Sequence, residues 1–238
     1  MEFLEIIKKL NVDTKDFSQV YAITLGRVYA VQQALEVNVI KQRNININFK
    51  ECLVKFGDDE QTFDAQYIGC DADKKVWLWG WNEKTETFPS SLYDLSNQMK
   101  KFGEDNEALY CKNPIYDLPT EQFGRFLCGA MTSLFNTCYA VCNTEKGRLF
   151  ISISNAPEVC FEKVDSLAFV NISKHCLQQN KISHKLFIEG FLLWNGTEYK
   201  VDGDTIVAKF EREVTITFKQ NGEQLMVEKM DVAAVEAK

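Results

Sequence analysis

Histidine is nearly absent from this sequence, which contains only His175 and His184. Neither has a cysteine or a carboxylate residue at a spacing that zinc sites use. The GxSxG, HExxH, GxGxxG and P-loop patterns are also missing, so the common fingerprints of hydrolases, metalloproteases and nucleotide-binding proteins are absent. We therefore expect no catalytic residue, no metal ion and no cofactor, and we favour a protein without enzymatic activity.

The few residues that suggest metal or acid–base chemistry have simpler interpretations. His175 falls on the polar flank of a predicted helix at 165–180, so we expect it to be exposed, and His184 is expected to begin a strand. Asp71 and Asp73 form a D-x-D pair, but lysines follow where a calcium loop needs oxygen ligands and glycine. We interpret this pair as an exposed turn.

Positive charge is also scarce. The 27 basic residues are outnumbered by 34 acidic ones, and basic residues cluster only in pairs such as Lys100 and Lys101. Phosphate neutralisation requires a basic stripe, so we expect no nucleic-acid partner. The segment MEFLEIIKKL has glutamates where a secretory signal has positive charges, and it lacks the apolar run of such a signal. These features favour a cytoplasmic location.

The sequence has no disulfide framework. Its eight cysteines are spread through apolar contexts and are too sparse for a disulfide scaffold at this length. We expect buried thiols in a reducing cytoplasm. Cys138 and Cys142 are four residues apart on one face of a predicted helix, but without a CxxC motif or histidine partners this spacing favours packing over metal binding.

One stretch tests the possibility of a membrane span. Residues 126–144 carry no charge over 19 positions, which is close to the length that crosses a bilayer. Arranged as a helix, they place Thr132, Asn136 and Asn143 on a polar stripe opposite a broad apolar arc. Because lipid tolerates such a stripe poorly, we expect a deeply buried helix and no membrane contact.

Breaks in the hydrophobic pattern are few, since there are only four prolines and twelve glycines and no low-complexity linker. Helical periodicity alternates with strand periodicity, and this order predicts an α+β fold in which antiparallel β-meanders pack against amphipathic helices. We expect two regions packed into the same compact unit: residues 1–160, with a helix, a meander and a buried helix, and residues 161–238, with a helix and a C-terminal meander. The expected helices cover 13–35, 90–103, 120–144 and 165–180, and the expected strands 45–56, 62–70, 75–82, 148–154 and the C-terminal quarter.

The stretch VWLWGWNE, residues 76–83, holds three of the four tryptophans. On a strand, Trp77, Trp79 and Trp81 project to the same side. An aromatic side chain buries about 150–250 Å², so an uncovered row would rival the largest apolar patch usual on a monomer, and we expect helices to cover it. Buried indole N–H groups need acceptors, however, which a groove edge with Asn82 nearby supplies more easily than a dry core. These four residues are therefore also the candidate binding residues.

At WLWGWN, residues 77–82, the sequence resembles a family of bacterial proteins of unknown function whose signature runs approximately W-L-W-A-W-A-N. The similarity covers residues 45–155 and includes YIG, a helix that ends in KKFG, and RLFISIS. Asn82 follows the third tryptophan directly, one position earlier than in the signature. The resemblance implies a bacterial, intracellular protein with a mixed helix and sheet fold, and it supplies no catalytic residue.

Two hypotheses for function follow. The first is a non-enzymatic cytoplasmic protein that binds a protein partner through its acidic surface, and an immunity or accessory role is one form of it. The second is a small-molecule binding protein, or an enzyme of unrecognised type, whose pocket is lined by Trp77, Trp79 and Trp81.

Overall fold

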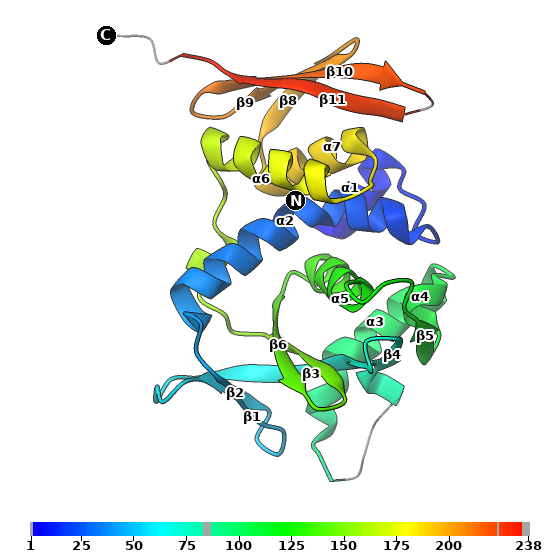
Figure 1. Cartoon of the computed structure of the whole chain (residues 1–238), viewed down its shortest axis with the longest axis vertical. Helices are drawn as coiled ribbons and strands as arrows, with labels where there is room; N and C mark the ends of the chain where they lie inside the picture. Colours follow the sequence, from blue (N-terminus) through cyan, green and yellow to red (C-terminus); the bar gives the residue numbers. More distant parts are fainter. Residues whose placement is uncertain (1, 83–86, 223, 235–238) are drawn as a thin grey trace. The chain divides into compact units, whose positions relative to one another are not determined.

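The computed structural model describes residues 2–82, 87–222 and 224–234 (Figure 1). Its helices and antiparallel strands confirm the α+β class. The helices are α1 (Phe3–Leu10), α2 (Phe17–Leu35), α3 (Asp94–Asp105), α4 (Leu109–Lys112), α5 (Phe123–Leu134), α6 (Ser166–Gln179) and α7 (His184–Asn195), with short π or 3₁₀ turns η1 (Glu36–Ile40), η2 (Gly80–Asn82), η3 (Ser90–Tyr93) and η4 (Glu158–Phe161). The strands are β1 (Ile45–Asn48), β2 (Leu53–Phe56), β3 (Thr62–Ala72), β4 (Val76–Trp79), β5 (Ile115–Asp117), β6 (Cys138–Thr144), β7 (Gly147–Ile153), β8 (Glu198–Asp202), β9 (Thr205–Lys209), β10 (Glu213–Asn221) and β11 (Gln224–Val232).

By their contacts, the residues fall into two compact units. Unit 1 contains the described residues of Met1–Asp13, Ser18–Ala30 and Glu162–Lys238, and unit 2 contains Thr14–Phe17 and the described residues of Val31–Phe161. Helix α1 and residues 18–30 of α2 thus group with the C-terminal region. The expected division into 1–160 and 161–238 stays a prediction. That both regions pack into the same compact unit stays a prediction.

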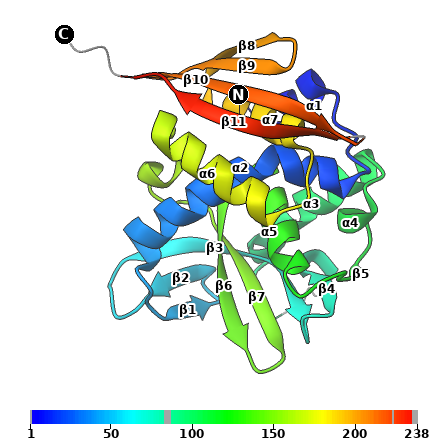
Figure 2. The ribbon, with the colours of Figure 1, turned by 45° about the horizontal axis from the view of Figure 1, so that its top comes forward.

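Unit 2 is built around the long strand β3. Its path runs β1-β2-β3-β4-β5, and β7 pairs with both β3 and β6 (Figure 2). Phe63, Ala65 and Tyr67 are buried while their neighbours Thr62 and Asp64 are exposed, as the two-residue period of a strand requires. Helices α3 and α5 contact β3, so their apolar faces contribute to the core of this unit.

Unit 1 combines helices α1, α6, α7 and part of α2 with the meander β11-β10-β9-β8. The sheet lies on α6 and α7 (Figure 1), and the predicted C-terminal meander is confirmed from β8 onward, whereas residues 184–195 before it form helix α7. Asp165 caps α6 by accepting a hydrogen bond from the Ala168 N–H, 2.8 Å away. Gly190 of α7 lies against Ile23 of α2, where a Cβ atom would come within 2.6 Å of the Ile23 Cα. A glycine is therefore needed at this helix contact.

The predicted helix at 126–144 is wrong in its second half. The helix α5 ends at Leu134, and residues 138–144 form strand β6, which pairs with β7 from Cys138↔Ile153 to Thr144↔Gly147. An apolar run of this length is compatible with both a helix and a strand, and the pairing with β7 decides between them. Within the described ranges, no helix combines the length and hydrophobicity needed to cross a bilayer.

None of the eight cysteines, all of which the structure describes, forms a disulfide; five of them are buried and three half-buried. Cys138 and Cys142 lie on strand β6, and not on a helix as predicted. Burial raises the pKa of the Cys111 and Cys176 thiols to about 12, so both are protonated at neutral pH. Because the thiolate is the reactive form, these two side chains act as packing residues.

Candidate functional site

The tryptophan motif begins on strand β4 and leaves it. Trp77 and Trp79 lie on β4, but Trp81 lies on the 3₁₀ turn η2, so the predicted row of three rings on one strand is wrong at Trp81. The pairing of β4 with β3 ends at Gly69↔Trp79. Gly80 then packs so closely that a Cβ atom would lie 2.6 Å from the Tyr67 carbonyl oxygen, and the chain turns there.

Two of the three rings are core residues. Trp77 and Trp79 are both 0% exposed, and their ring centroids are 5.2 Å apart in an edge-to-face arrangement. The Phe150 ring lies 5.0 Å from Trp77. Trp79 Nε1 donates a hydrogen bond to the Tyr110 carbonyl oxygen at 3.1 Å, whereas the buried Nε1 of Trp77 has no hydrogen-bond acceptor in the part of the chain that the structure describes. The Trp79 indole N–H thus joins β4 to α4.

A buried ion pair lies beside Trp77. Asp71 is 0% exposed and accepts hydrogen bonds from the Arg148 backbone N–H at 2.7 Å and from Arg148 Nε at 2.6 Å. Arg148 Nη2 also contacts Asp71 and donates to the Glu121 carbonyl oxygen. The interpretation of Asp71 as part of an exposed turn is therefore wrong, because the β3–β7 register places Arg148 directly opposite it.

This ion pair fixes the start of helix α5. A Cβ atom at Gly124 would lie 3.1 Å from Asp71 Oδ2 and 3.4 Å from Trp77 Cε3, so α5 packs closely over both side chains. The arrangement is fully enclosed: Arg148 satisfies the carboxylate, and Trp77 and Phe150 surround the pair. The pair is therefore a buried structural contact and offers no open reaction site.

Trp81 and Asn82 form the accessible end of the motif. Trp81 is half-buried, with Lys100 Nζ 4.8 Å from its ring centroid, and Asn82 is exposed. The ammonium over the ring is a cation–π contact between η2 and α3. Of the four candidate binding residues, only these two have exposed surface, and a binding role for the four stays a prediction.

A family model matches residues 18–156 of the chain, which is more than half of its length and includes the whole tryptophan motif. The chain belongs to DUF6882, a family of unknown function. The expected membership in a family without an established activity is thus confirmed, while the W-L-W-A-W-A-N signature and a bacterial origin stay predictions. Comparison with curated proteins and with solved structures gives no match.

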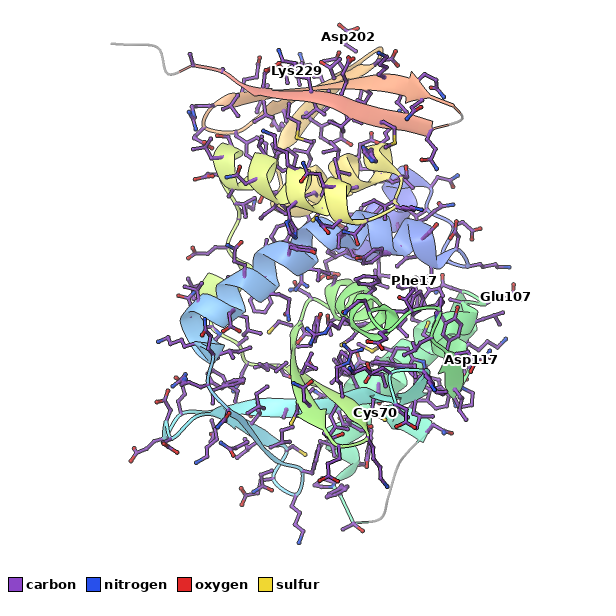
Figure 3. All side chains as sticks on the ribbon, viewed as in Figure 1. Phe17, Cys70, Glu107, Asp117, Asp202 and Lys229 are labelled. Atoms are coloured by element: carbon purple, nitrogen blue, oxygen red, sulfur yellow. The ribbon has the colours of Figure 1, made fainter. Side chains whose placement is uncertain are left out.

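Within the region that DUF6882 covers, the structure exposes apolar side chains on an acidic stretch. Leu109 on α4 is 58% exposed, and Ile115 on β5 is 53% exposed. From residue 104 to 121 the sequence has five acidic residues and one basic residue, and Glu107 and Asp117 lie on the same side of unit 2 (Figure 3). We call Glu107, Leu109, Ile115 and Asp117 the 107–117 surface.

Trp79 holds the backbone between the two apolar residues of the 107–117 surface. Its indole N–H donates to the Tyr110 carbonyl oxygen, and its backbone N–H donates to the Pro114 carbonyl oxygen at 3.2 Å. The Tyr110 hydroxyl in turn donates to the Thr14 carbonyl oxygen at 2.8 Å. Composition predicts acidic character but not this surface, because the tertiary contacts that bury Tyr110 and Cys111 also determine that Leu109 and Ile115 remain exposed.

The two histidines have different environments. His175 is exposed, as predicted. The prediction of a strand at His184 is wrong: this residue is the first of α7, with Ser183 as the cap, and it is buried. Its Nδ1 accepts a hydrogen bond from the Val227 backbone N–H of β11 at 3.0 Å, and burial lowers its pKa. His184 therefore links α7 to the sheet in its neutral form.

Acidification from pH 7.5 to pH 5 should destabilise the protein through His184. In the unfolded chain this side chain takes up a proton near pH 6.5, whereas in the fold its pKa is lower, so the folded state binds fewer protons. Its contribution is complete above about pH 6.5 and is lost as the pH falls below that value. We expect urea midpoints to fall less on acidification for His184→Gln than for the wild-type protein.

The exposed His175 provides the matched control for this measurement. His175→Gln should keep the pH dependence of the wild-type protein, because its imidazole forms no buried hydrogen bond to the backbone among the described residues. An unchanged pH dependence in His184→Gln would contradict the prediction.

Proposed function

We propose that the protein acts by binding a protein partner in the cytoplasm, without catalysis, and that the 107–117 surface is the contact region. The observation that supports this most is the exposure of two large apolar side chains, Leu109 and Ile115, on a segment that Trp79 holds in place. Apolar residues surrounded by charged ones are typical of protein interfaces.

The rigidity of this segment favours recognition. Trp79 binds the carbonyl oxygens of Tyr110 and Pro114, so the backbone between Leu109 and Ile115 is ordered before a partner arrives. Ordering a loop on binding costs free energy, and a preformed surface avoids that cost. The buried tryptophan motif thus supports the surface from within.

The chemistry of the surface indicates the kind of partner. Asp117 lies on β5 with Ile115, whereas Glu107 near Leu109 already pairs with Lys15, and the chain carries a net charge of −7. A partner with an apolar socket and basic residues around it is complementary to this arrangement. Association should then slow as the salt concentration rises, since exposed charges are screened.

Replacing both apolar residues tests the proposal. We expect Leu109→Ser with Ile115→Ser to abolish capture of a partner that the wild-type protein enriches from the lysate of its own cells, because the anchors of the interface are lost. Quantitative mass spectrometry after affinity capture is the measurement. Both side chains are more than half exposed, so the fold should persist, which circular dichroism can verify.

The control is Leu167→Ser, which changes a leucine of α6 in unit 1 of similar exposure (50%). This variant should retain the partner. If no protein is enriched over a control bait, or if the double variant and Leu167→Ser retain it equally, the 107–117 surface is not the contact region.

A further inference from the structure

A second candidate site lies in unit 1, outside the region of the family match. A pocket of about 630 Å³ lies beside α1, the end of α7, and strands β8 and β9. Ligand pockets typically measure about 300–1,000 Å³, so this volume suits an organic molecule larger than a single ion. Its lining residues include Lys9, Thr197, Glu198, Tyr199, Lys200 and Lys209.

The charge of this pocket is opposite to that of the whole chain. Three lysines and one glutamate give the lining a formal charge of +2, whereas the chain as a whole has −7. Two charged groups outside the lining adjoin it: a Cβ atom at Gly196, which also lines the pocket, would collide with Lys163 Nζ, and the Glu189 carboxylate interacts with Lys9 and accepts a hydrogen bond from Tyr199. A local concentration of positive charge in a concave site raises the local concentration of anions.

The side chains of the pocket differ in their burial and in their interaction partners. Lys209 Nζ lies 3.2 Å from Glu198 Oε2 across the β8–β9 pair, and both side chains are largely exposed. Solvent screens such a pair, so an incoming anion can replace Glu198 as the partner of Lys209. The Tyr199 hydroxyl, in contrast, donates to Glu189 at 3.5 Å, and burial together with Glu189 raises the Tyr199 pKa to about 12.

We propose that this pocket binds a small organic anion with at least two negative charges, held by Lys9, Lys200 and Lys209. Buried Leu193 provides an apolar contact at the same pocket, and the Thr197 hydroxyl provides a further donor. Lysine presents a compact charge with three donors, which suits phosphate and carboxylate groups alike. The site is independent of the 107–117 surface, so either proposal can fail without the other.

Isothermal titration calorimetry on the full chain tests the site with four probes: ATP, pyrophosphate, citrate and, as the neutral comparison, adenosine. We expect at least one anion to bind with a Kd below about 1 mM, and adenosine not to bind. Binding should weaken as NaCl is raised. If ATP and pyrophosphate bind and citrate does not, the ligand carries phosphate groups. If citrate binds and the other two do not, the ligand is a polycarboxylate.

Three variants assign the binding to the pocket. Lys200→Ala with Lys209→Ala should weaken binding by about tenfold or more, since each exposed ion pair contributes a factor of up to about five to the affinity. Glu198→Gln should strengthen it, because the competing carboxylate is removed. Lys219→Ala is the control: it changes an exposed lysine of β10 that pairs with Glu228 and does not line the pocket.

The proposal is overturned if none of the three anions binds to the wild-type protein, or if adenosine binds as tightly as ATP. Equal weakening by Lys219→Ala and by the double lysine variant would also overturn it, because a nonspecific charge effect would then explain the binding. A gain in thermal stability with the bound anion, lost in the double variant, is the independent readout.

Discussion

Replacing Trp79 with alanine should lower the free energy of unfolding by about 3–5 kcal/mol. The ring is 0% exposed and packs edge-to-face on Trp77, so its removal leaves a cavity that the surrounding sheet and helices fill only in part. The hydrogen bond to the Tyr110 carbonyl oxygen is lost as well. Urea unfolding followed by far-ultraviolet circular dichroism measures the change without relying on tryptophan emission.

Two variants separate the causes of this loss. Trp81→Ala removes a half-exposed ring and should cost less than about 2 kcal/mol. Trp79→Phe keeps most of the volume but removes the indole donor, so it should fall between the wild-type protein and Trp79→Ala. If Trp79→Ala and Trp81→Ala were equally stable, the assignment of Trp79 to the core would be contradicted.

Replacing Arg148 with methionine should cost about 3–5 kcal/mol, because it leaves the Asp71 carboxylate buried without its cation. The guanidinium contacts of Arg148 with Asp71 and with the Glu121 carbonyl oxygen connect β7, β3 and the approach to α5, and these disappear, while the hydrogen bond from the backbone N–H of residue 148 to Asp71 Oδ1 can remain. The same urea experiment measures the loss. The buried pair is thus expected to matter far more for stability than the surface ion pairs.

A double variant and a surface pair are the controls for this prediction. Combining Arg148→Met with Asp71→Asn removes both charges, so it should be more stable than Arg148→Met alone. Asp105→Asn breaks an ion pair with Lys101 whose side chains are 74% and 56% exposed, and it should cost at most about 1 kcal/mol. A double variant less stable than Arg148→Met would argue against an electrostatic origin.

Several elements could be predicted because the hydrophobic pattern of their own residues fits either a helix or a strand, but not both. The helix at 165–180 has a capping residue, Asp165, at its start, and the observed α6 differs from the prediction by a single residue at each end. The C-terminal meander has turn residues between alternating runs, and β8–β11 follow them. In both cases, signals within a few residues of one another determine the structure.

The wrong predictions occur where contacts with residues far away in the sequence determine the structure. Residues 138–144 form a strand because β7 pairs with them, and Asp71 is buried because Arg148, 77 residues later, lies opposite. Trp81 leaves the strand just after the pairing of β4 with β3 and with β5 ends. The pocket in unit 1 combines Lys9 with residues 193–209, which no local pattern connects.

By itself, the sequence determined the α+β class, the acidic character, and membership in a family without a known activity, because composition, periodicity and motif are properties of neighbouring residues. Only the tertiary structure decided which tryptophans form the core, which carboxylate forms a buried ion pair, and which apolar side chains remain exposed. The physical reason is that burial and charge pairing depend on strand register and helix contacts between residues far apart in the chain.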